Sequence, residues 1–381
     1  MLYEFKNLKA LNEAFKRLNN LRRWTSFLTD GKYDEIAKQS LNWCICFILA
    51  AEMEARGNSI RWELFPKIAV YRAFEKAYVY FDTPERVLKE IYASDPIRDF
   101  NIEIRQVTPK KIAKLTDEEF AQFVSEGCGT YEEFIYKAAT KIATYVELLE
   151  IKSLIKSGYR SKYNEIKEEM SEYLKLPEFK KLKNKYGKFF KTFMDISKLR
   201  NQNRWAIYSY STDCSVLGHL FDTAVFGYFL ALEDGYSEIE ATHCFFLGIF
   251  HDVAETYTKD IPATIKDELS GFRNMVEQYE QKMLDTYFYP KLSKTAQKAV
   301  KSVMFETEEN SKYKTLIKGA DYISAVSEIW RQFKSGTRDH AFIDAMEHHK
   351  RKFENSEITK LTSSFKEFYE WLQEYAESLQ I

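Results

Sequence analysis

Long runs of apolar residues at helical spacing are the feature that most restricts how this chain can fold. The segment "YEEFIYKAATKIATYVELLEIKSLI", residues 131–155, places apolar side chains at positions i, i+3, i+4 and i+7, which line one face of an α-helix. Valine and isoleucine form no alternating runs of strand length, and only 13 glycines and 7 prolines interrupt the 381 residues. The sequence therefore predicts an all-α fold with much of its core filled by tyrosine and phenylalanine.

The chain also repeats itself. Four pairs of segments resemble each other, at offsets of 181, 180, 178 and 179 residues. They pair "LRRW" at 21–24 with "NQNRW" at 201–205, "VYRAFEKAYVYFDTP" at 70–84 with "IFHDVAETYTKDIP" at 249–262, "KIATYVELLEIKSLIKSG" with "GADYISAVSEIWRQFKSG", and "KLKNKYGKFFKTF" with "KLTSSFKEFYEWL". We interpret the chain as two tandem copies of one helical domain, residues 1–196 and residues 197–381.

Charge and cysteine content restrict the partners and the compartment. The 56 basic and 57 acidic residues leave a net charge of −1, which argues against a nucleic-acid-binding protein because such proteins usually carry a basic excess. The five cysteines have no disulfide or zinc-knuckle spacing. The longest apolar run, "CICFILAA", is too short to span a membrane. We expect a cytoplasmic protein with reduced thiols and no membrane partner.

The second half carries residue types that bind metals. His219 lies in "SVLGHLFDTAVFGYFLA", His251 and Asp252 follow the apolar segment "ATHCFFLGIF", and Asp321 lies in "IKGADYISAVSEIW". Two imidazoles with one or two carboxylates can bind a divalent transition metal (Mn, Fe, Co, Ni or Zn) and leave positions open for water and substrate. Glu255 lies one helical turn after His251, so it can face the metal as a general acid or base without binding it.

In these residues the second half resembles the HD-domain metal-dependent phosphohydrolases. The resemblance narrows to the HD-domain 5'-deoxynucleotidases, because "RW" stands fifteen residues before His219 and is followed by "HDVAETYTKDIPATIK" and "KGADYISA". It covers residues 200 to about 335 and implies removal of the 5'-phosphate from deoxynucleoside monophosphates. The family usually has Ala-Glu before the first histidine, where this chain has Leu217 and Gly218. This departure alters the surroundings of His219 rather than the ligands themselves.

The resemblance implies a role for each matching residue. The metal ligands would be His219, His251, Asp252 and Asp321. Glu255 would position or protonate the reacting phosphate, with Asp260 near the sugar or the attacking water. Arg204 would contact the phosphate, for which a guanidinium is well shaped. Trp205 would pack beside the sugar, where a bulky ring disfavours a 2'-hydroxyl, although simple core packing accounts for this residue equally well.

The first copy lacks the ligands. By the repeat offsets, His219 maps near Ser40, His251 onto Tyr71, Asp252 onto Arg72, and Asp321 onto Ala143 or Thr144. Counterparts of the other motif residues remain, namely Arg23, Trp24, Glu75, Asp82 and Pro84. We therefore expect a degenerate HD-like domain that persists mainly as a scaffold. Because the resembling enzymes work as dimers, the two copies would form an internal pseudo-dimer within a monomer or a further homo-oligomer.

Three functions stay open at the level of the sequence. The first is hydrolysis of nucleoside monophosphates, and the second is hydrolysis of nucleoside triphosphates or signalling nucleotides by the same HD chemistry. The third is a non-catalytic module that binds a nucleotide. The full ligand set together with Glu255 favours an enzyme, since a binding module needs neither a complete metal site nor a proton donor.

Overall fold

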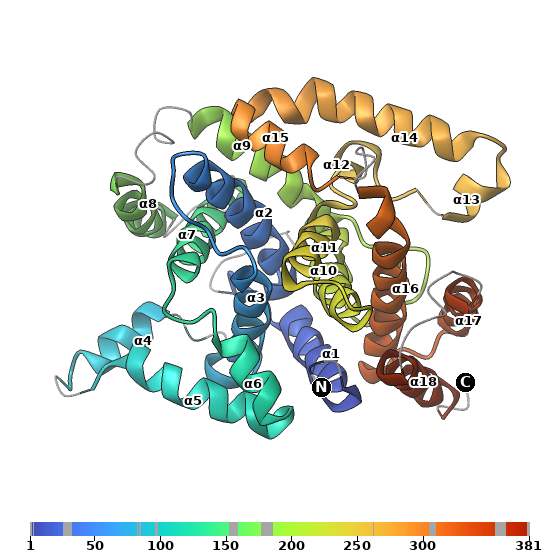
Figure 1. Ribbon diagram of the computed structural model, residues 1–381, viewed down its shortest axis with the longest axis horizontal. Helices are drawn as coiled ribbons and strands as arrows, with labels where there is room; N and C mark the ends of the chain where they lie inside the picture. The colour runs from blue at the N-terminus through green and yellow to red at the C-terminus, as the bar shows by residue number, and fades with distance from the viewer. Residues whose placement is uncertain are drawn as a thin grey trace.

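The structure is a computed structural model and describes residues 2, 4–25, 33–81, 83, 85–95, 98–151, 159–176, 186–261, 263–304, 310–354 and 363–378. Within these ranges every regular element is a helix, and the remaining backbone pairing consists of two isolated β-bridges (Figure 1). The prediction of an all-α fold is therefore confirmed. Asp82, Pro84 and Pro262 lie outside the described residues.

The helices divide between the two halves of the chain. In the first half they are α1 (Phe5–Asn20), α2 (Glu35–Glu54), α3 (Leu64–Glu75), α4 (Glu85–Tyr92), α5 (Phe100–Leu115), α6 (Glu118–Ser125), α7 (Tyr131–Ile151), α8 (Tyr159–Lys175) and α9 (Tyr186–Ser197). In the second half they are α10 (Val216–Glu233), α11 (Glu238–Phe250), α12 (Glu255–Thr258), α13 (Ala263–Glu268), α14 (Phe272–Met283), α15 (Lys294–Lys301), α16 (Ser311–Lys334), α17 (Ala341–Glu354) and α18 (Ser363–Glu377). Short π-helical turns extend α3 at Lys76–Tyr80 and α14 at Leu284–Phe288.

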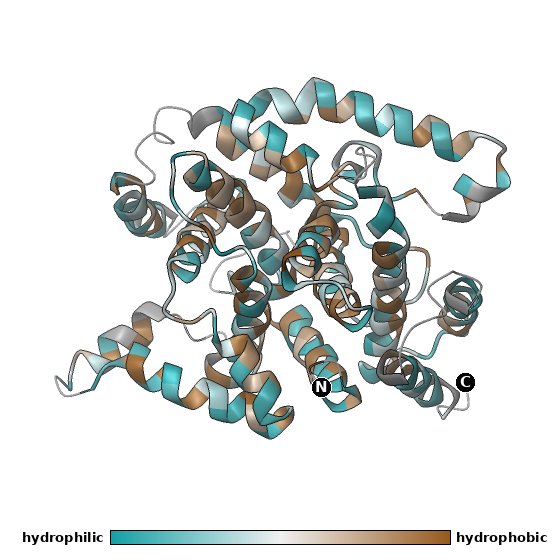
Figure 2. Cartoon of the chain, in the orientation of Figure 1, coloured by the Kyte–Doolittle hydropathy of each residue, from teal (hydrophilic) through white to brown (hydrophobic). Residues whose placement is uncertain are grey.

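The buried centre of the molecule is built around α10. This helix packs against α11, α16 and α2, and α2 in turn packs against α7. α10 is long and apolar enough to cross a membrane, but 94% of it is buried inside the protein, as in the core helix of a soluble protein. Figure 2 shows hydrophobic residues concentrated on the central helices, whereas the outer helix α14 carries many hydrophilic residues.

Glycine allows α10 and α11 to approach each other closely. A Cβ atom on Gly248 would lie 2.5 Å from the Cα of Ala224, so any larger residue would push the two helices apart. Both helices begin at a capping serine, Ser215 and Ser237, whose side chains accept backbone N–H groups of the first turn. The crossing therefore fixes the first turns of α10 relative to the last turn of α11.

The two halves share apolar packing. The ring centroid of Trp43 on α2 lies 5.5 Å from that of Phe245 on α11, and the centroids of Phe47 and Phe246 lie 4.7 Å apart. α1 packs against α18, so the first and last helices are neighbours (Figure 1). Each half therefore covers hydrophobic surface that the other would otherwise expose to water.

The starts of α2 and α10 are alike and lie 181 residues apart. An isolated β-bridge precedes each helix and ends at its capping residue, Asp34 or Ser215. Counted from these caps, His219 corresponds to Lys38, two residues before Ser40, near which the sequence offsets place it.

A second contact recurs with the same separation. In each half an indole N–H donates to a buried glutamate at 2.9 Å, from Trp24 to Glu147 and from Trp205 to Glu328. On this register Asp321 corresponds to Thr140, one helical turn before the position that the sequence offsets predict. These parallel contacts support the interpretation of two tandem copies.

Candidate metal centre

The four predicted metal ligands lie together. His219 comes from the first turn of α10, His251 and Asp252 directly follow α11, and Asp321 lies in the middle of α16. The ligand atoms of the two histidines and Asp252 are within 4.8 Å of one another. Asp321 joins them through His219, whose Nε2 atom lies 3.1 Å from its Oδ1 atom. Metal–ligand distances of about 2.0–2.2 Å place two donors of one ion at most about 4.4 Å apart, so the cluster needs to close by no more than a few tenths of an ångström to hold one ion.

Both aspartates are held in the ionised form that binds metals. Although burial opposes ionisation, the adjacent His251 imidazole lowers the pKa of the Asp252 carboxyl below its ordinary value. Burial also opposes ionisation of Asp321, but Lys318 and His219 lower its pKa well below the usual range. The site therefore offers two carboxylates at neutral pH, as metal coordination requires.

The imidazole of His251 is oriented as metal-binding histidines usually are. Its Nδ1 atom donates to the backbone carbonyl of Gly248 at 2.7 Å, which leaves Nε2 as the free acceptor. This buried Nε2 atom has no hydrogen-bond partner among the described residues, although Oδ2 of Asp252 lies 3.0 Å away. When the ring is protonated, the proton on Nε2 faces the Asp252 carboxylate and lowers its pKa, and a metal cation would take the place of that proton when the ring is neutral. The donor set therefore fits a divalent metal.

His219 is buried and tied to Glu328, which sequence analysis did not single out. The Nδ1 atom of His219 lies 3.0 Å from Oε1 of Glu328. Although burial and Arg204 favour the neutral ring, Glu328 and Asp321 raise the pKa of His219 to about 9. Glu328 itself has a pKa of about 2, because Arg204 and His219 outweigh the effect of burial. Its one sequence signal is its spacing of seven residues, two helical turns, from Asp321.

Arg204 and Trp205 lie beside the ligands and share Glu328 as their partner. An Nη1 atom of Arg204 lies 3.3 Å from Oε1 of Glu328, and Nη2 lies 3.5 Å from Asp321. The Trp205 ring is 5% exposed and packs against Tyr208 and Phe342, with centroids 5.8 and 5.5 Å away. The guanidinium thus belongs to the site, whereas the indole is a core side chain over most of its surface.

Glu255 is buried next to the aspartates. Burial, together with the negative charges of Asp252 and Asp260, raises the pKa of the Glu255 carboxyl well above its ordinary value. The nearest cation is Lys266, whose Nζ atom lies 3.9 Å from Oε1. The surroundings of Glu255 therefore favour its protonated form, the form in which a carboxyl can act as a general acid.

Asp260 is exposed at the edge of the site, where the chain turns after α12. Lys259 has a positive φ of 63°, which reverses the backbone there. Gln202 holds both ends of the turn, because its amide donates to the Glu255 carbonyl at 3.1 Å and accepts from the Asp260 backbone N–H at 3.2 Å. No motif in the sequence marked Gln202, since its contacts arise only from folding.

The fold and the donor set define the class of protein. Histidines and aspartates gathered from separate helices of an all-α domain are the arrangement of the HD-domain hydrolases, a metal-dependent class. The family model described as "5'-deoxynucleotidase YfbR-like" matches residues 188–372. The second half of the chain therefore belongs to this HD-domain family, and the match begins within α9. No curated protein matches the sequence at a significant level.

Proposed function

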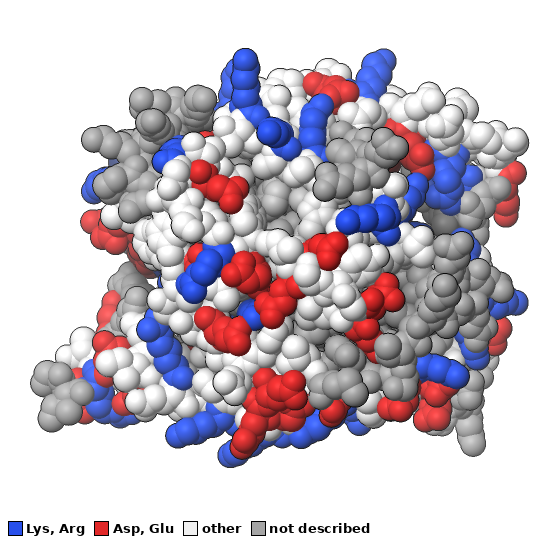
Figure 3. Space-filling model, viewed as in Figure 1, with Lys and Arg blue, Asp and Glu red and all other residues white. Residues whose placement is uncertain are grey.

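We propose that the second half of the chain is a metal-dependent phosphohydrolase that removes the 5'-phosphate from nucleoside monophosphates, with deoxy forms preferred. The observation that carries this proposal is the cluster of His219, His251 and Asp252 beside the buried Glu255, whose pKa is raised, in a family described by 5'-deoxynucleotidase activity. The balanced charge of the surface agrees with a small substrate, since Figure 3 shows acidic and basic side chains interspersed on the face it presents.

The four clustered residues would hold the metal. They are His219, His251, Asp252 and Asp321. Mixed imidazole and carboxylate donors suit Mn, Co, Fe, Ni or Zn. When bound, such an ion supplies positive charge to the phosphoryl oxygens and lowers the pKa of a water molecule.

The other residues of the site would act on the phosphate ester directly. Arg204 is positioned by Glu328 to bind the phosphate through its planar guanidinium. Water attacks phosphorus, the bond to the 5'-oxygen breaks, and the proton of Glu255 passes to the departing oxygen. Asp260, at the exposed edge, would contact the sugar or orient the attacking water.

Trp205 is the candidate for selection against ribose, and one variant separates that role from packing. Trp205→Phe keeps a ring against Phe342 but loses the hydrogen bond to Glu328. If the indole borders the sugar, the ratio of kcat/KM for deoxy over ribo substrates falls in this variant. An unchanged ratio with a lowered melting temperature assigns Trp205 to the core alone.

A substrate panel tests the proposed activity. The chelated protein is supplied with Mn or Co and offered ribo- and deoxynucleoside 5'-mono- and triphosphates, and the released phosphate, pyrophosphate and triphosphate are measured separately. Phosphate released from deoxynucleoside monophosphates supports the proposal. Triphosphate release indicates a triphosphohydrolase, and a metal-loaded protein inert on every phosphoester indicates a nucleotide-binding module.

We further propose that residues 1–196 and 197–381 are copies of one domain that pair within a single cytoplasmic chain. The recurring tryptophan–glutamate contacts support the duplication. The five free cysteines support a reducing compartment. Sedimentation at 45 kDa would match an internal pair, whereas a mass of twice that value would show further dimerisation.

A further inference from the structure

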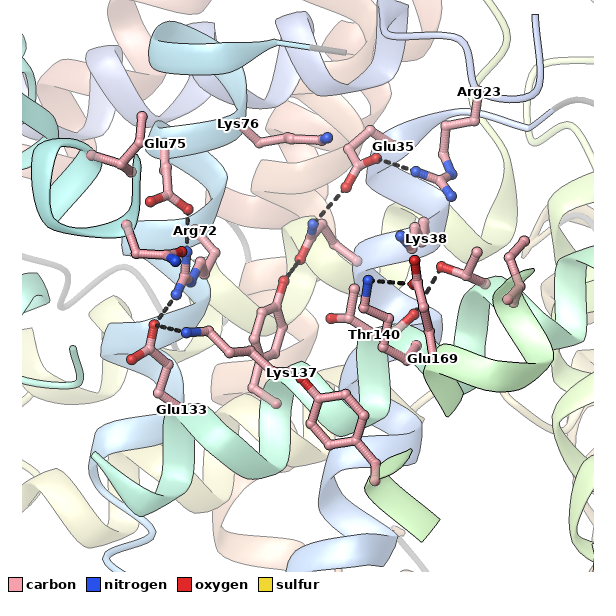
Figure 4. Close-up of a pocket in the computed structure, with 18 of the residues that line it drawn as sticks. Arg23, Glu35, Lys38, Arg72, Glu75, Lys76, Glu133, Lys137, Thr140 and Glu169 are labelled. Atoms are coloured by element: carbon pink, nitrogen blue, oxygen red, sulfur yellow. Dashed lines mark hydrogen bonds and ion pairs between the residues drawn. The ribbon is translucent and has the colours of Figure 1, made fainter. Parts of the chain in front are cut away.

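A cavity of about 570 Å³ lies in the first half of the chain, among α2, α3, α5, α7 and α8 (Figure 4). Cavities of this size hold small ligands. Eight lysine and arginine side chains line it, against five glutamates. The first half therefore contains a concave site with an excess of positive charge, outside the part of the chain that the family model matches.

This cavity is the counterpart of the metal centre. The residues that correspond to His219, Asp252 and Asp321 all line it, and they are Lys38, Arg72 and Thr140. Arg23 and Trp24, the counterparts of Arg204 and Trp205, line it as well. Two fixed cations thus stand at positions where the second half would hold a metal ion. A metal cannot bind beside them, but a phosphate can.

Lys38 is the strongest evidence for an anion site in this cavity, because its side chain is buried without a close partner. The residue is 6% exposed and lies in the first turn of α2, on the wall of the cavity. Its ammonium makes no hydrogen bond or close ion pair with any residue that the structure describes, and the Glu35 and Glu147 carboxylates attract it only from a greater distance. Burial and the nearby Arg23 guanidinium lower its pKa to about 7. A buried, unpaired ammonium costs stability, and an anion in the cavity would relieve that cost.

The remaining walls are held rigid by ion pairs. Arg72 pairs with Glu75 and Glu133, and Figure 4 shows these three side chains at one end of the cavity. Lys141 pairs with Glu169 at 2.7 Å across α7 and α8. The half-buried Tyr173 also lines the cavity and offers ring surface to a nucleobase, whereas Tyr71 and Tyr136 on the same wall are only 2% and 5% exposed.

We propose that this cavity binds a nucleoside phosphate and does not hydrolyse it, with the phosphate against Lys38 and Arg72. The charge excess selects the phosphate, and Tyr173 accommodates the base. Hydrolysis is not expected, because cations replace the metal ligands at the corresponding positions. The site goes beyond the proposed hydrolase activity, since it lies in the other half of the chain.

Binding of deoxyadenosine monophosphate to the full chain in EDTA tests the proposal. The Arg204→Ala variant weakens the second-half site, so that titration calorimetry reports the first-half cavity. We expect one nucleotide per chain in this background, and at least tenfold weaker binding when Lys38→Met is added. Lys110→Met, an exposed lysine on α5 outside the cavity, is the matched control and should change affinity less than twofold.

Two outcomes overturn the proposal. One is the absence of binding in the Arg204→Ala protein, and the other is affinity that Lys38→Met leaves unchanged. Inorganic phosphate that binds as tightly as the nucleotide overturns the assignment to a nucleoside phosphate. Melting curves check that each variant folds. If Lys38→Met does not fold, Lys137→Met on the partly exposed wall replaces it, with several-fold weaker binding expected.

Discussion

Asp252 and Glu255 are carboxylic acids three residues apart with opposite proton affinities. His251 lowers the pKa of Asp252 against the effect of burial, whereas burial and the charge of Asp252 raise that of Glu255. Two acids whose pKa values are driven apart in one site can serve as metal ligand and proton donor. The environment, not the residue type, therefore separates their roles.

Substitution of each acid should give a different defect. Asp252→Ala should abolish both metal binding and turnover. Glu255→Gln should keep the metal while kcat falls by a factor of roughly 100 or more, because the proton donor is lost. Metal content after gel filtration and phosphate release measure the two effects. Unreduced kcat in the Glu255 variant would remove this residue from the mechanism.

Glu328 is expected to act through the residues that it holds. Glu328→Gln should weaken metal affinity by about 10- to 100-fold, the usual effect of losing a partner of a metal-ligating histidine. The matched control is Glu147→Gln, which removes the corresponding contact with Trp24 in the first half and should leave metal affinity unchanged in the folded protein. Equal losses in both variants would show a general effect on folding instead.

Among individual residues, the sequence identified those site residues whose spacing along the chain forms a motif. The four candidate ligands, Glu255 and Arg204 could be singled out because histidine, aspartate and arginine recur at family spacing along the chain, and the structure brings them close together. Glu328 and Gln202 could not, because each is defined by what it touches after folding. Gln202, for example, holds two backbone groups more than 50 residues away in the chain.

Among the helices, the crossing of α10 and α11 is the contact on which the site depends most. Gly248→Ala should destabilise the fold by about 1–3 kcal/mol, the cost of overpacking, because the new methyl group would meet the backbone of Ala224. Metal affinity should fall with it, since the crossing positions His219 and His251. Thermal melting and metal titration measure the two effects.

Gly218→Ala provides the matched comparison for this crossing. Its nearest neighbour would be the Cγ2 methyl group of Ile36, at 2.9 Å, which belongs to a side chain and can move more readily than backbone. The loss of stability should therefore be smaller than for Gly248→Ala. A larger loss at Gly218 would contradict the account of the helix crossing.

The end of α10 contains a buried carboxyl that makes stability depend on pH. Both oxygens of Glu233 are buried without a partner among the described residues, and burial followed by Asp234 raises its pKa from 4.5 to about 8. Below pH 4.5 the carboxyl is protonated in both the folded and the unfolded chain, so the free energy of unfolding is at its full value. As the pH rises through 8 the buried carboxyl has to ionise, and that part of the free energy of unfolding is lost. Glu233→Gln should therefore stabilise the protein by about 2 kcal/mol at pH 9 and by little at pH 4. Denaturant titrations at both pH values check this, and a gain at pH 4 equal to that at pH 9 would contradict it.

The helical segments could be predicted from the apolar periodicity, but the residue-by-residue correspondence between the two halves could not. The segment 131–155 was expected to be helical, and α7 spans Tyr131–Ile151. The π-helical turn at Lys76–Tyr80 has no counterpart in an apolar pattern, because that pattern does not distinguish one hydrogen-bonding ladder from another. The offset of 181 residues that holds at the starts of α2 and α10 is not kept in the later segment pairs, so no single offset places every counterpart.

Over the whole molecule, the shared core predicts that the second half is not stable alone. A fragment of residues 197–381 would expose Phe245 and Phe246, which pack against Trp43 and Phe47 of α2. Burial of apolar surface is the main stabilising contribution, so this fragment should be insoluble or lack a cooperative melting transition. Soluble expression and circular dichroism test this. A monomeric fragment that melts cooperatively would show that the halves are independent domains.

The measurement that tests the central claim most directly is phosphate release from deoxyadenosine monophosphate by the chelated full-length protein, as a function of added Mn or Co. The claim is that the His219, His251, Asp252 and Asp321 cluster binds a metal for phosphomonoester hydrolysis. It predicts release that is absent after chelation, rises with bound metal to one equivalent and is lost in Asp252→Ala. Metal bound at one equivalent without release, or release that Asp252→Ala leaves intact, would contradict it.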